Sequence, residues 1–431
     1  MQSSSDLFSY PNDWSEQALE AVAEINPESL GSSTPSSFQF QYIDISSVNV
    51  GVIDWHSVIT QVFATAPSRA RRIVCPGDVL LSTVRPGLQS HAFADWGDGS
   101  DSYICSTGFA VIRAGRALEP RFLRHLVFSN IVATQLNRLE TGSNYPAVPE
   151  SDVKLLHIPV PPLPEQRRIA EILDAADEAI RQTERLIAKL KAVKAGLLQD
   201  LLTHGLDEHG HLRDPQAHPE QFKDSPMGRI PGEWQVRRLG EFGEFKNGLN
   251  KGKEDFGFGT KFVNISDVYL PRLDTDNLGR MNATSSEVES YRLEVGDILF
   301  DRSSVKLEGV GYPTVFEGAD EPVIFCGFII RFRMLESIAR PIFLCEQMRD
   351  ELFRNRMFQI ATRSANVNVN QEQLSKLQVV LPPVQEQETI ITILDIHNAR
   401  IRAEEAELAK LRKVKRGLMD DLLTGKVRVK L

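Results

Sequence analysis

The sequence predicts an α+β protein with two similar domains, each followed by a long helix, arranged as a pseudo-two-fold internal repeat. Residues 161–204 and 382–425 align without a gap and agree at 22 of 44 positions. Shorter motifs ahead of these segments also recur, at an offset of about 220 residues. Solenoid repeats have periods of about 20–50 residues, so this much longer period indicates two equivalent domains.

Each domain is expected to contain a curved, mostly antiparallel sheet. The recurring motifs are short, rich in Val, Ile, Phe and Tyr, and bounded by Gly, Pro, Asn or Asp, which is typical of strands. One such pair is Gly77-Asp78-Val79-Leu80 and Gly296-Asp297-Ile298-Leu299. Between the motifs the two halves differ freely, which indicates one scaffold with two different surfaces.

The two long segments are expected to be helices that pack against each other as a coiled coil. Apolar residues recur along both at 3–4 spacing, and each segment opens with two prolines and an early glutamate. About 40 helical residues reach roughly 60 Å. Gly196 and Gly417 lie inside the helices and predict a close approach or a bend. The helices are also the predicted partner-binding elements, through the seam residues Ile169, Leu173, Ile180, Leu190, Ile390, Leu394, Ile401 and Leu411.

The joint between the halves is polar and holds several histidines. A histidine cluster can bind metal, but no supporting Cys or carboxylate spacing is present, so we expect a solvated linker. The expected segments are a first domain at 1–160, a helix at 161–204, a linker at 205–230, a second domain at 231–381 and a helix at 382–425.

The composition indicates an ordinary globular protein, with 42% hydrophobic and 25% charged residues. No apolar run is long enough for a membrane helix and the N-terminus does not look like a secretory signal, so a cytoplasmic location is expected. The four scattered cysteines favour buried, reduced thiols over a zinc or redox site. The net charge of −9 argues weakly against a nucleic-acid partner, although a sum does not show how charges are distributed.

A search for catalytic motifs finds none that is complete. The sequence has no phosphate-binding Gly-x-x-x-x-Gly-Lys loop and no complete dinucleotide fingerprint. Asp152-Val153-Lys154 resembles the end of a nuclease metal site, but the other half has Gln373-Leu374-Ser375 in its place. We therefore expect no catalytic residue, no metal and no cofactor on this chain.

Two polar loops recur in each half and are the best candidates for contacts. One follows the Gly-Asp strand and the other precedes the strand that leads into the long helix. Their Arg, Lys, Ser, Thr and Asn side chains suit phosphates and base edges, although polar loops that only face water look similar. The candidate DNA-binding residues are Ser82, Thr83, Arg85, Ser143, Asn144, Tyr145, Arg302, Ser303, Ser304, Lys306, Arg363, Ser364 and Asn366.

With these motifs the chain resembles the DNA-specificity subunit (S subunit) of type I restriction-modification systems. The Pro-Pro-x-x-Glu-Gln openings at 161–166 and 382–387 and the Gly-Leu-x-x-Asp-Leu-Leu-Thr endings are the main basis, with Pro231-Gly232-Glu233-Trp234 in support. Gln385 replaces Pro164 in the second opening, a minor departure. The resemblance covers essentially the whole chain.

The resemblance implies two target recognition domains, each of which reads one half of a split double-stranded DNA target. The two helices would pack antiparallel as a spacer whose length sets the gap between half-sites. Two modification subunits would methylate adenine with S-adenosylmethionine, and restriction subunits would join to cleave DNA, so the chain itself would be non-catalytic. A coiled-coil scaffold without DNA, or a self-contained DNA-modifying enzyme without recognisable motifs, are the alternatives.

Overall fold

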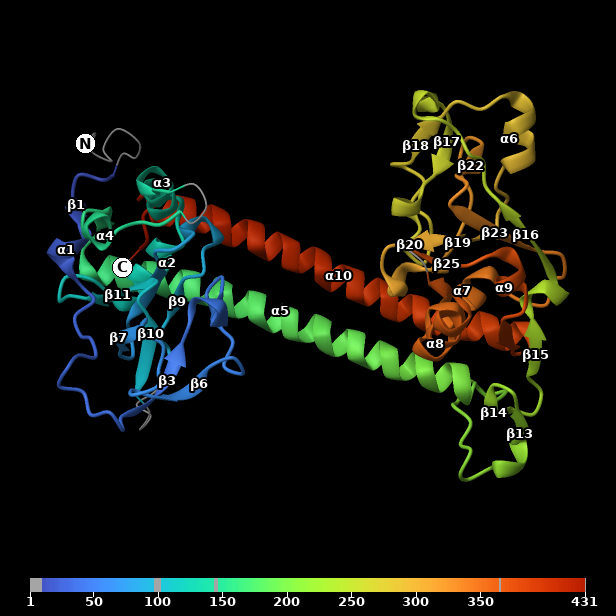
Figure 1. Ribbon diagram of the computed structural model, residues 1–431, viewed down its shortest axis with the longest axis horizontal. Coiled ribbons are helices and arrows are strands. Elements are labelled where there is room, and N and C mark those ends of the chain that lie inside the picture. Colours follow the sequence, from blue (N-terminus) through green and yellow to red (C-terminus); the bar gives the residue numbers. More distant parts are fainter. Residues whose placement is uncertain (1–9, 97–101, 143–145, 364–365, 431) are drawn as a thin grey trace. The chain divides into compact units, whose positions relative to one another are not determined.

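The protein forms two compact units (Figure 1). The computed structural model describes residues 10–96, 102–142, 146–363 and 366–430. Unit 1 comprises Met1–Arg185 and Glu405–Leu431, and unit 2 comprises Leu186–Glu404. The helices α5 (Leu163–Thr203) and α10 (Val384–Leu422) each contribute one part to each unit. The compact units thus differ from the expected segments, because each core includes residues of both helices.

Unit 1 is built from small sheets with short helices beside them. A two-stranded sheet joins its first and last strands, and two four-stranded sheets form the body. The orders are β1 (Ser15–Ala18)–β12 (His157–Val160), β6 (Ile59–Val62)–β3 (Gln39–Ile43)–β10 (Tyr103–Ser106)–β7 (Ala70–Val74), β2 (Ala23–Ile25)–β11 (Phe109–Ala114)–β8 (Val79–Ser82)–β9 (Ala92–Phe93) and the hairpin β4 (Val48–Asn49)–β5 (Val52–Ile53). The helices are α1 (Leu19–Val22), α2 (Pro120–Val127), α3 (Asn130–Leu139) and α4 (Glu150–Lys154).

Unit 2 repeats this plan with additional strands. The orders are β15 (Gln235–Arg238)–β26 (Gln378–Leu381), β18 (Gly279–Met281)–β17 (Phe256–Val263)–β22 (Val323–Phe325), β16 (Gly243–Asn247)–β23 (Ile329–Met334)–β19 (Ile298–Asp301)–β21 (Pro313–Val315), β20 (Ser303–Ser304)–β25 (Val367–Asn368)–β24 (Thr362–Arg363) and β13 (Phe222–Ser225)–β14 (Gly228–Pro231). The helices are α6 (Ser285–Tyr291), α7 (Pro341–Arg349), α8 (Glu351–Ile360) and α9 (Gln371–Ser375).

The four-stranded sheets β2-β11-β8-β9 and β16-β23-β19-β21 match, as do the pairs β1-β12 and β15-β26, which confirms two similar α+β domains. Among the described residues most strand pairs are antiparallel, and a parallel pair of strands stands at the equivalent place in each unit, β3 with β10 and β17 with β22. The expected single curved sheet is wrong in one respect, since each unit divides its strands among several small sheets.

The repeated Gly-Asp motif precedes a fully buried strand in each unit. In β8, Val79 and Leu81 lie in one hydrophobic core and Leu80 in another, because successive side chains of a strand point to opposite faces. β19 is buried in the same alternating way. An apolar run with no polar alternation is what a strand covered on both faces requires.

The aspartate of the same motif anchors the neighbouring strand through an arginine. Asp78 accepts hydrogen bonds from Arg113 Nε and Nη2, both at 2.9 Å. Asp297 accepts from Arg333 Nε and Nη2, both at 2.7 Å. These carboxylates are almost completely buried, and bidentate pairing with Arg compensates their burial. The motif therefore recurs because it builds the scaffold.

The two long helices contact each other in both units. In unit 1, Asp177 pairs with Lys415 and Glu184 pairs with Arg412. A later residue of α5 therefore pairs with an earlier residue of α10, so the two helices run antiparallel there. In unit 2, Leu201 shares a core with residues of α10. The continuous coiled-coil seam stays a prediction.

The seam residues differ in their burial, and this corrects the expectation that all of them are available to a partner. Ile169, Leu173, Ile390 and Leu394 are at most 2% exposed and lie in the chain's own cores, so their side chains are not available to a partner. Ile401 is also buried, whereas Ile180, Leu190 and Leu411 are half-buried.

The helix glycines do not mark a close approach. Gly196 and Gly417 are exposed, and a Cβ added at either would meet no heavy atom within 4 Å beyond the helix's own backbone. The expected close approach there is wrong, because the facing side chains lie elsewhere on the helices.

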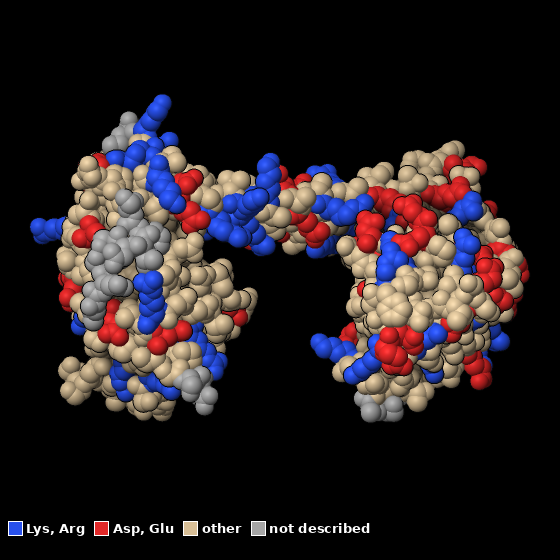
Figure 2. Space-filling model, turned by 90° about the horizontal axis from the view of Figure 1, so that it is seen from above, with Lys and Arg blue, Asp and Glu red and all other residues tan. Residues whose placement is uncertain are grey.

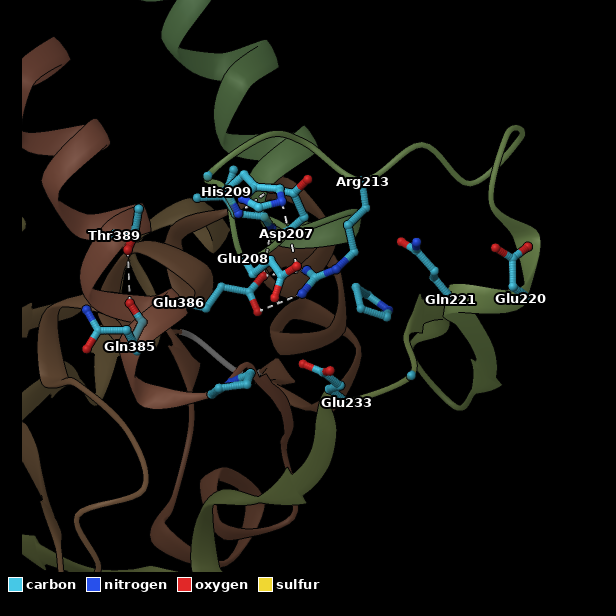
Figure 3. A pocket seen from close by; sticks show the side chains of 15 residues that line it. Asp207, Glu208, His209, Arg213, Glu220, Gln221, Glu233, Gln385, Glu386 and Thr389 are labelled. Carbon is cyan, nitrogen blue, oxygen red and sulfur yellow. Dashed lines mark hydrogen bonds and ion pairs between the residues drawn. The ribbon is translucent and has the colours of Figure 1, made fainter.

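A buried glutamate at the start of α10 ties three segments of unit 2 together. Glu386 accepts hydrogen bonds from Trp234 Nε1 at 3.1 Å and from Arg213 Nη1 at 2.7 Å; Figure 3 shows Arg213 pointing at Glu386. Arg213 belongs to the chain that follows α5, so this contact fastens the linker to α10.

Unit 1 has the same Trp-Glu-Arg cluster at the start of α5. Glu165 accepts from Trp14 Nε1 at 3.0 Å and from Arg428 Nε at 2.7 Å. Arg428 lies in the chain that follows α10 and also pairs with Asp13. In each unit the segment that leaves one long helix is therefore bound to the first turn of the other.

A pocket of about 860 Å³ beside the unit 2 cluster is part of this fastening (Figure 3). One of its carboxylates serves the local fold, since Asp207 accepts from the backbone N–H groups of His209 at 2.9 Å and His211 at 2.8 Å. Within the described ranges, no three His, Cys, Asp or Glu side chains group in a way that suits a metal ion.

Across those same ranges, no helix combines the length and apolar character needed to cross a membrane.

Candidate nucleic-acid interface

The fold brings together the two candidate loops of unit 2. Strand β20 pairs with β25, which also pairs with β24. In this small sheet Ser303 lies opposite Asn368 and Ser304 opposite Val367. The loop after the Gly-Asp strand is thereby joined to the segment before the last strand, although about 60 residues separate them in the sequence.

Unit 1 joins its two candidate loops in the same way. Val84 forms a bridge with Ala147, and Thr141 forms another with the same residue. Arg85 N donates to Pro146 O at 2.7 Å, and Val148 N donates to Thr83 O at 2.8 Å. The candidates Ser143, Asn144, Tyr145 and Ser364 lie outside the described residues, as does the side chain of Arg363.

Beside the joined loops of unit 1 is a pocket of about 470 Å³ with two arginines in its lining. Arg69 and Arg85 are exposed, and none of the lining residues is acidic. A Cβ at Gly108 would lie 2.2 Å from Ile45 Cδ1, so a larger residue there would displace the end of the Ile45 side chain. The lining is Ile45, Arg69, Val84, Arg85, Leu88, Ser90, Thr107, Gly108 and Ala147.

The loop that supplies Arg85 has a strained backbone. Arg85 and Gln89 have φ of 48° and 50° and flank the short 3₁₀ helix Pro86–Leu88. Left-handed backbone in residues other than glycine is uncommon and concentrates at functional sites. Leu88 between them is 63% exposed, so the loop holds an apolar side chain out into solvent beside the guanidinium.

Unit 2 has a pocket of about 680 Å³ at the equivalent place. Ile265 lines it as Ile45 lines the first, and both isoleucines belong to the motif pair 42–46 and 262–266. The chemistry differs, because two tyrosine rings and one lysine replace the two arginines. The lining is Ile265, Tyr269, Ser303, Ser304, Val305, Lys306, Glu308, Gly309 and Tyr312.

A buried carboxyl group bonds two residues that line the unit 2 pocket. Asp301 is fully buried and accepts from Ser303 N at 3.0 Å and Tyr269 Oη at 3.1 Å. Burial raises the pKa of Asp301 to about 6, while the two hydrogen bonds and Arg354 oppose the rise. The carboxyl therefore connects two walls of the pocket.

In unit 1, neutral groups lie at the place equivalent to Asp301. Ser82 takes the place of Asp301 at the end of the buried strand, and its N–H donates to His91 Nδ1 at 3.0 Å. Burial lowers the pKa of His91 to about 4, so the ring is neutral at physiological pH.

Two candidate DNA contacts are corrected by these hydrogen bonds. Ser82 is fully buried and its Oγ donates to Val84 O at 2.9 Å; Thr83 is 9% exposed and its Oγ1 donates to Gly108 O at 2.9 Å. Both side chains shape the loop rather than face outwards. Ser82 bonds the local backbone, as short polar side chains often do, and Thr83 bonds the turn before β11; loop composition alone reveals neither contact.

Of the remaining unit 2 candidates, Ser303, Ser304 and Lys306 line the pocket, whereas Arg302 and Asn366 are not among its lining residues. Lys306 and Asn366 are exposed, and Ser303 and Ser304 are half-buried. Arg302 is half-buried and donates to Gly327 O at 3.4 Å.

Sequence reasoning missed Arg69 and Tyr269, which line the pockets from other segments, and Tyr312, which lies at the end of the unit 2 loop itself. Tyr269 follows the Ile265 motif by four residues, so its place after a recurring motif was the available signal. Arg69 and Tyr312 have no counterpart signal, since the segments around them differ between the halves.

The face in Figure 2 shows Lys and Arg interspersed with Asp and Glu along the long helices, without one continuous basic surface. The overall charge of −9 is thus compatible with local cationic groups at the pockets. A site of this kind supplies a few positioned donors beside apolar walls, which suits readout of base edges better than general attraction to phosphates.

Comparisons with known proteins agree on one family. The family model described as "Type I restriction modification DNA specificity domain" matches residues 11–192 and 231–413. The putative type I restriction enzyme MjaX specificity subunit of Methanocaldococcus jannaschii is 24% identical over 443 residues, which cover 99% of this chain and 96% of that protein.

Other relatives match over a shorter length. The MjaVIII specificity subunit of the same organism is 26% identical over 291 residues, 67% of this chain and 66% of that protein. The EcoKI specificity subunit of Escherichia coli is 26% identical and is matched over 61% of its length. The matched region thus spans about two thirds of these two relatives.

A solved structure has the same fold along nearly the whole chain. It comes from a study of complex assembly and conformational transition of the type I R-M system, with a TM-score of 0.62, 26% identity and coverage of 97% of this chain and 100% of that chain. The family match covers both units, and the chain therefore belongs to the family of type I restriction-modification DNA specificity domains.

Proposed function

We propose that the chain is the non-catalytic subunit that gives a type I restriction-modification complex its DNA sequence specificity. The observation that supports this most is the recurrence of one pocket at equivalent places in both units, with different linings. Two similar but unequal sites suit a double-stranded target with two different half-sites. The family match favours this over a scaffold without DNA or a self-contained DNA-modifying enzyme.

The lining of each pocket suggests how it reads DNA. In unit 1, Arg69 and Arg85 offer planar donor pairs that suit guanine O6 and N7 or phosphate oxygens. In unit 2, Lys306 offers a point charge, and Tyr269 and Tyr312 offer ring faces and hydroxyls. The apolar wall from Ile45 or Ile265 supplies van der Waals contact, so each unit selects its own half-site.

The long helices are the proposed docking elements for partners. Val193, Ile396 and Val414 are large apolar residues of α5 and α10 that are 48%, 65% and 49% exposed. We propose that two modification subunits bind such exposed faces and methylate adenine with S-adenosylmethionine, which those subunits would hold. Restriction subunits would join the same assembly in the cytoplasm, and helix length would set the gap between half-sites.

Methylation mapping tests the proposed function. The chain is expressed with its modification subunits in a host without other adenine methylation, and methylated adenines are mapped across the genome. We expect one split target in which both halves are defined, and no methylation when the chain is omitted. Methylation without sequence preference, or a preference that persists without the chain, would contradict the proposal.

A further inference from the structure

One wall of the unit 2 pocket is a loop with little regular structure of its own. The 302–312 loop contains the short strand β20 and a 3₁₀ turn at Leu307–Gly309. It supplies most of the pocket lining, including Lys306 and Tyr312. Residues on such a loop have a defined position for reading DNA only if other side chains hold the loop in place.

Arg354 of α8 holds the far part of this loop. Its Nη1 donates to Gly311 O at 2.9 Å, and its Nη2 donates to Glu308 O at 3.0 Å and Val310 O at 2.6 Å. The guanidinium also lies 5.3 Å from the centre of the Tyr312 ring. One side chain thus fixes three backbone carbonyls and contacts a ring that lines the pocket.

Burial of this guanidinium costs free energy unless its contacts with the loop are kept. Arg354 is 6% exposed, and the partners named above are neutral carbonyls rather than a carboxylate. Burial lowers the pKa of Arg354 to about 10, so the side chain stays charged at neutral pH. A buried cation that relies on backbone carbonyls resists any displacement of those carbonyls.

Asp301 holds the near part of the same loop. Its carboxylate accepts from Ser303 N at 3.0 Å and from Tyr269 Oη at 3.1 Å, and its own N–H donates to Tyr312 O at 3.2 Å. Gly311 N donates to Asp301 O at 2.7 Å. The start and end of the loop are therefore fastened to one buried residue.

In the described part of unit 1, the equivalent loop is fastened without buried charges. Ser82 stands in the place of Asp301. Helix α3, which follows α2 as α8 follows α7, contains one basic residue, Arg138, and its side chain is exposed. The pair of buried charges is thus a feature of unit 2 and not a requirement of the common scaffold.

We propose, on the basis of the DNA-reading function above, that Arg354 and Asp301 are positioning residues that fix the 302–312 loop for readout of the unit 2 half-site. Both side chains are buried and neither residue lines the pocket, so each acts through the loop. Weakening them should relax base discrimination at that half-site and leave the other half-site unchanged.

The test uses the full complex with its modification subunits and DNA in which each target base pair is substituted in turn. Lys306→Ala and Arg85→Ala identify which half-site each unit reads. Arg354→Lys keeps the charge and most of the volume, but one ammonium does not reach three carbonyls, and Arg354→Met removes the charge. We expect both Arg354 variants to lower discrimination in the unit 2 half-site about tenfold, with the other half-site unchanged within about twofold.

A matched control separates this role from general destabilisation. Arg331 is 4% exposed in the same unit and pairs with Glu244 at 2.9 Å, on a strand that does not line the pocket. Arg331→Met should lower thermal stability without changing discrimination. Hydrogen exchange at residues 308–312 should be faster in Arg354→Lys than in the control, and unchanged exchange there would overturn the proposal.

The outcomes also separate this inference from the proposed function. If the wild-type complex shows no sequence preference, both fail together. If the wild type discriminates and folded Arg354→Lys discriminates equally well, only the positioning role is overturned. An equal loss at both half-sites would likewise overturn it, since the effect would then lie in assembly.

Discussion

The two pockets share a scaffold but differ in how their walls are held. In unit 1 the loop beside the pocket has left-handed backbone at Arg85 and Gln89 and rests on neutral groups. In unit 2 the loop is fastened by a buried aspartate and a buried arginine. The scaffold contacts, such as the buried Asp-Arg pair ahead of each central strand, are the same in both units. The pockets and the residues directly beneath them therefore differ between the units, whereas these scaffold contacts are shared.

The largest difference in stability between equivalent substitutions in the two halves is expected at their Trp-Glu-Arg clusters. Replacing Glu386 with Ala would leave Arg213 unpaired at 11% side-chain exposure, whereas Glu165→Ala would leave Arg428 at 43% exposure with Asp13 still beside it. We expect a loss of about 3 kcal/mol for Glu386→Ala and about 1 kcal/mol for Glu165→Ala, because an unpaired buried charge costs more. Calorimetric unfolding measures both, with Glu208→Ala as an exposed control. Equal losses would show that the clusters are equivalent.

A second difference is the response of unit 2 to pH. The pKa of Asp301 is raised to about 6 by burial, with Tyr269 and Arg354 facing the carboxyl. Because the folded pKa exceeds the unfolded value, the ionised group destabilises unit 2, and this cost grows as pH rises from about 4 to 6. Asp301→Asn should therefore gain about 2 kcal/mol relative to wild type between pH 4.5 and pH 8. Denaturant unfolding at both pH values checks this, and a gain that does not depend on pH would contradict it.

Unit 1 should respond to pH in the opposite direction. Burial lowers the pKa of His91 to about 4, below its ordinary value of 6.5. The unfolded chain therefore binds a proton more readily, and the stability that neutral His91 gives is present above pH 6.5 and is lost as pH falls towards 4. The loss at pH 5.5 is about 1.4 kcal/mol for this group. Comparing wild type with His91→Asn at pH 7.5 and 5.5 isolates it, and parallel stability changes in the two proteins would exclude it.

The smallest effect is expected on the long helices, where the two halves are alike. Gly196→Ala and Gly417→Ala should each raise stability by up to about 1 kcal/mol, because both positions are open and alanine favours helix more than glycine. Thermal unfolding of the two variants measures it. A loss at either position would restore the idea of a close contact there.

The scaffold was readable from the sequence because its residues occur twice. The long helices, the buried strands after Gly77 and Gly296 and the two-domain plan all follow from recurring motifs. The loops were located for the same reason, since each follows a recurring strand.

The details of the reading surface were not readable from one sequence. Ser82 and Thr83 looked like contacts, but the Ser82 hydroxyl donates to Val84 O within the loop and the Thr83 hydroxyl donates to Gly108 O in the turn before β11. Arg354 lies about 50 residues beyond the loop that it holds, and only the tertiary fold brings the two together. The seam residues Ile169 and Ile390 looked available to a partner because helical spacing does not show which neighbour covers a face.

The central claim is that each unit reads its own half-site, and selection from DNA with both half-sites randomised tests it most directly. The complex is compared as wild type, with Arg85→Ala in unit 1 and with Lys306→Ala in unit 2. We predict that each variant loses sequence information in a single half of the target, a different half for each, while the other half and the gap are kept. Loss in both halves from either substitution would contradict the account.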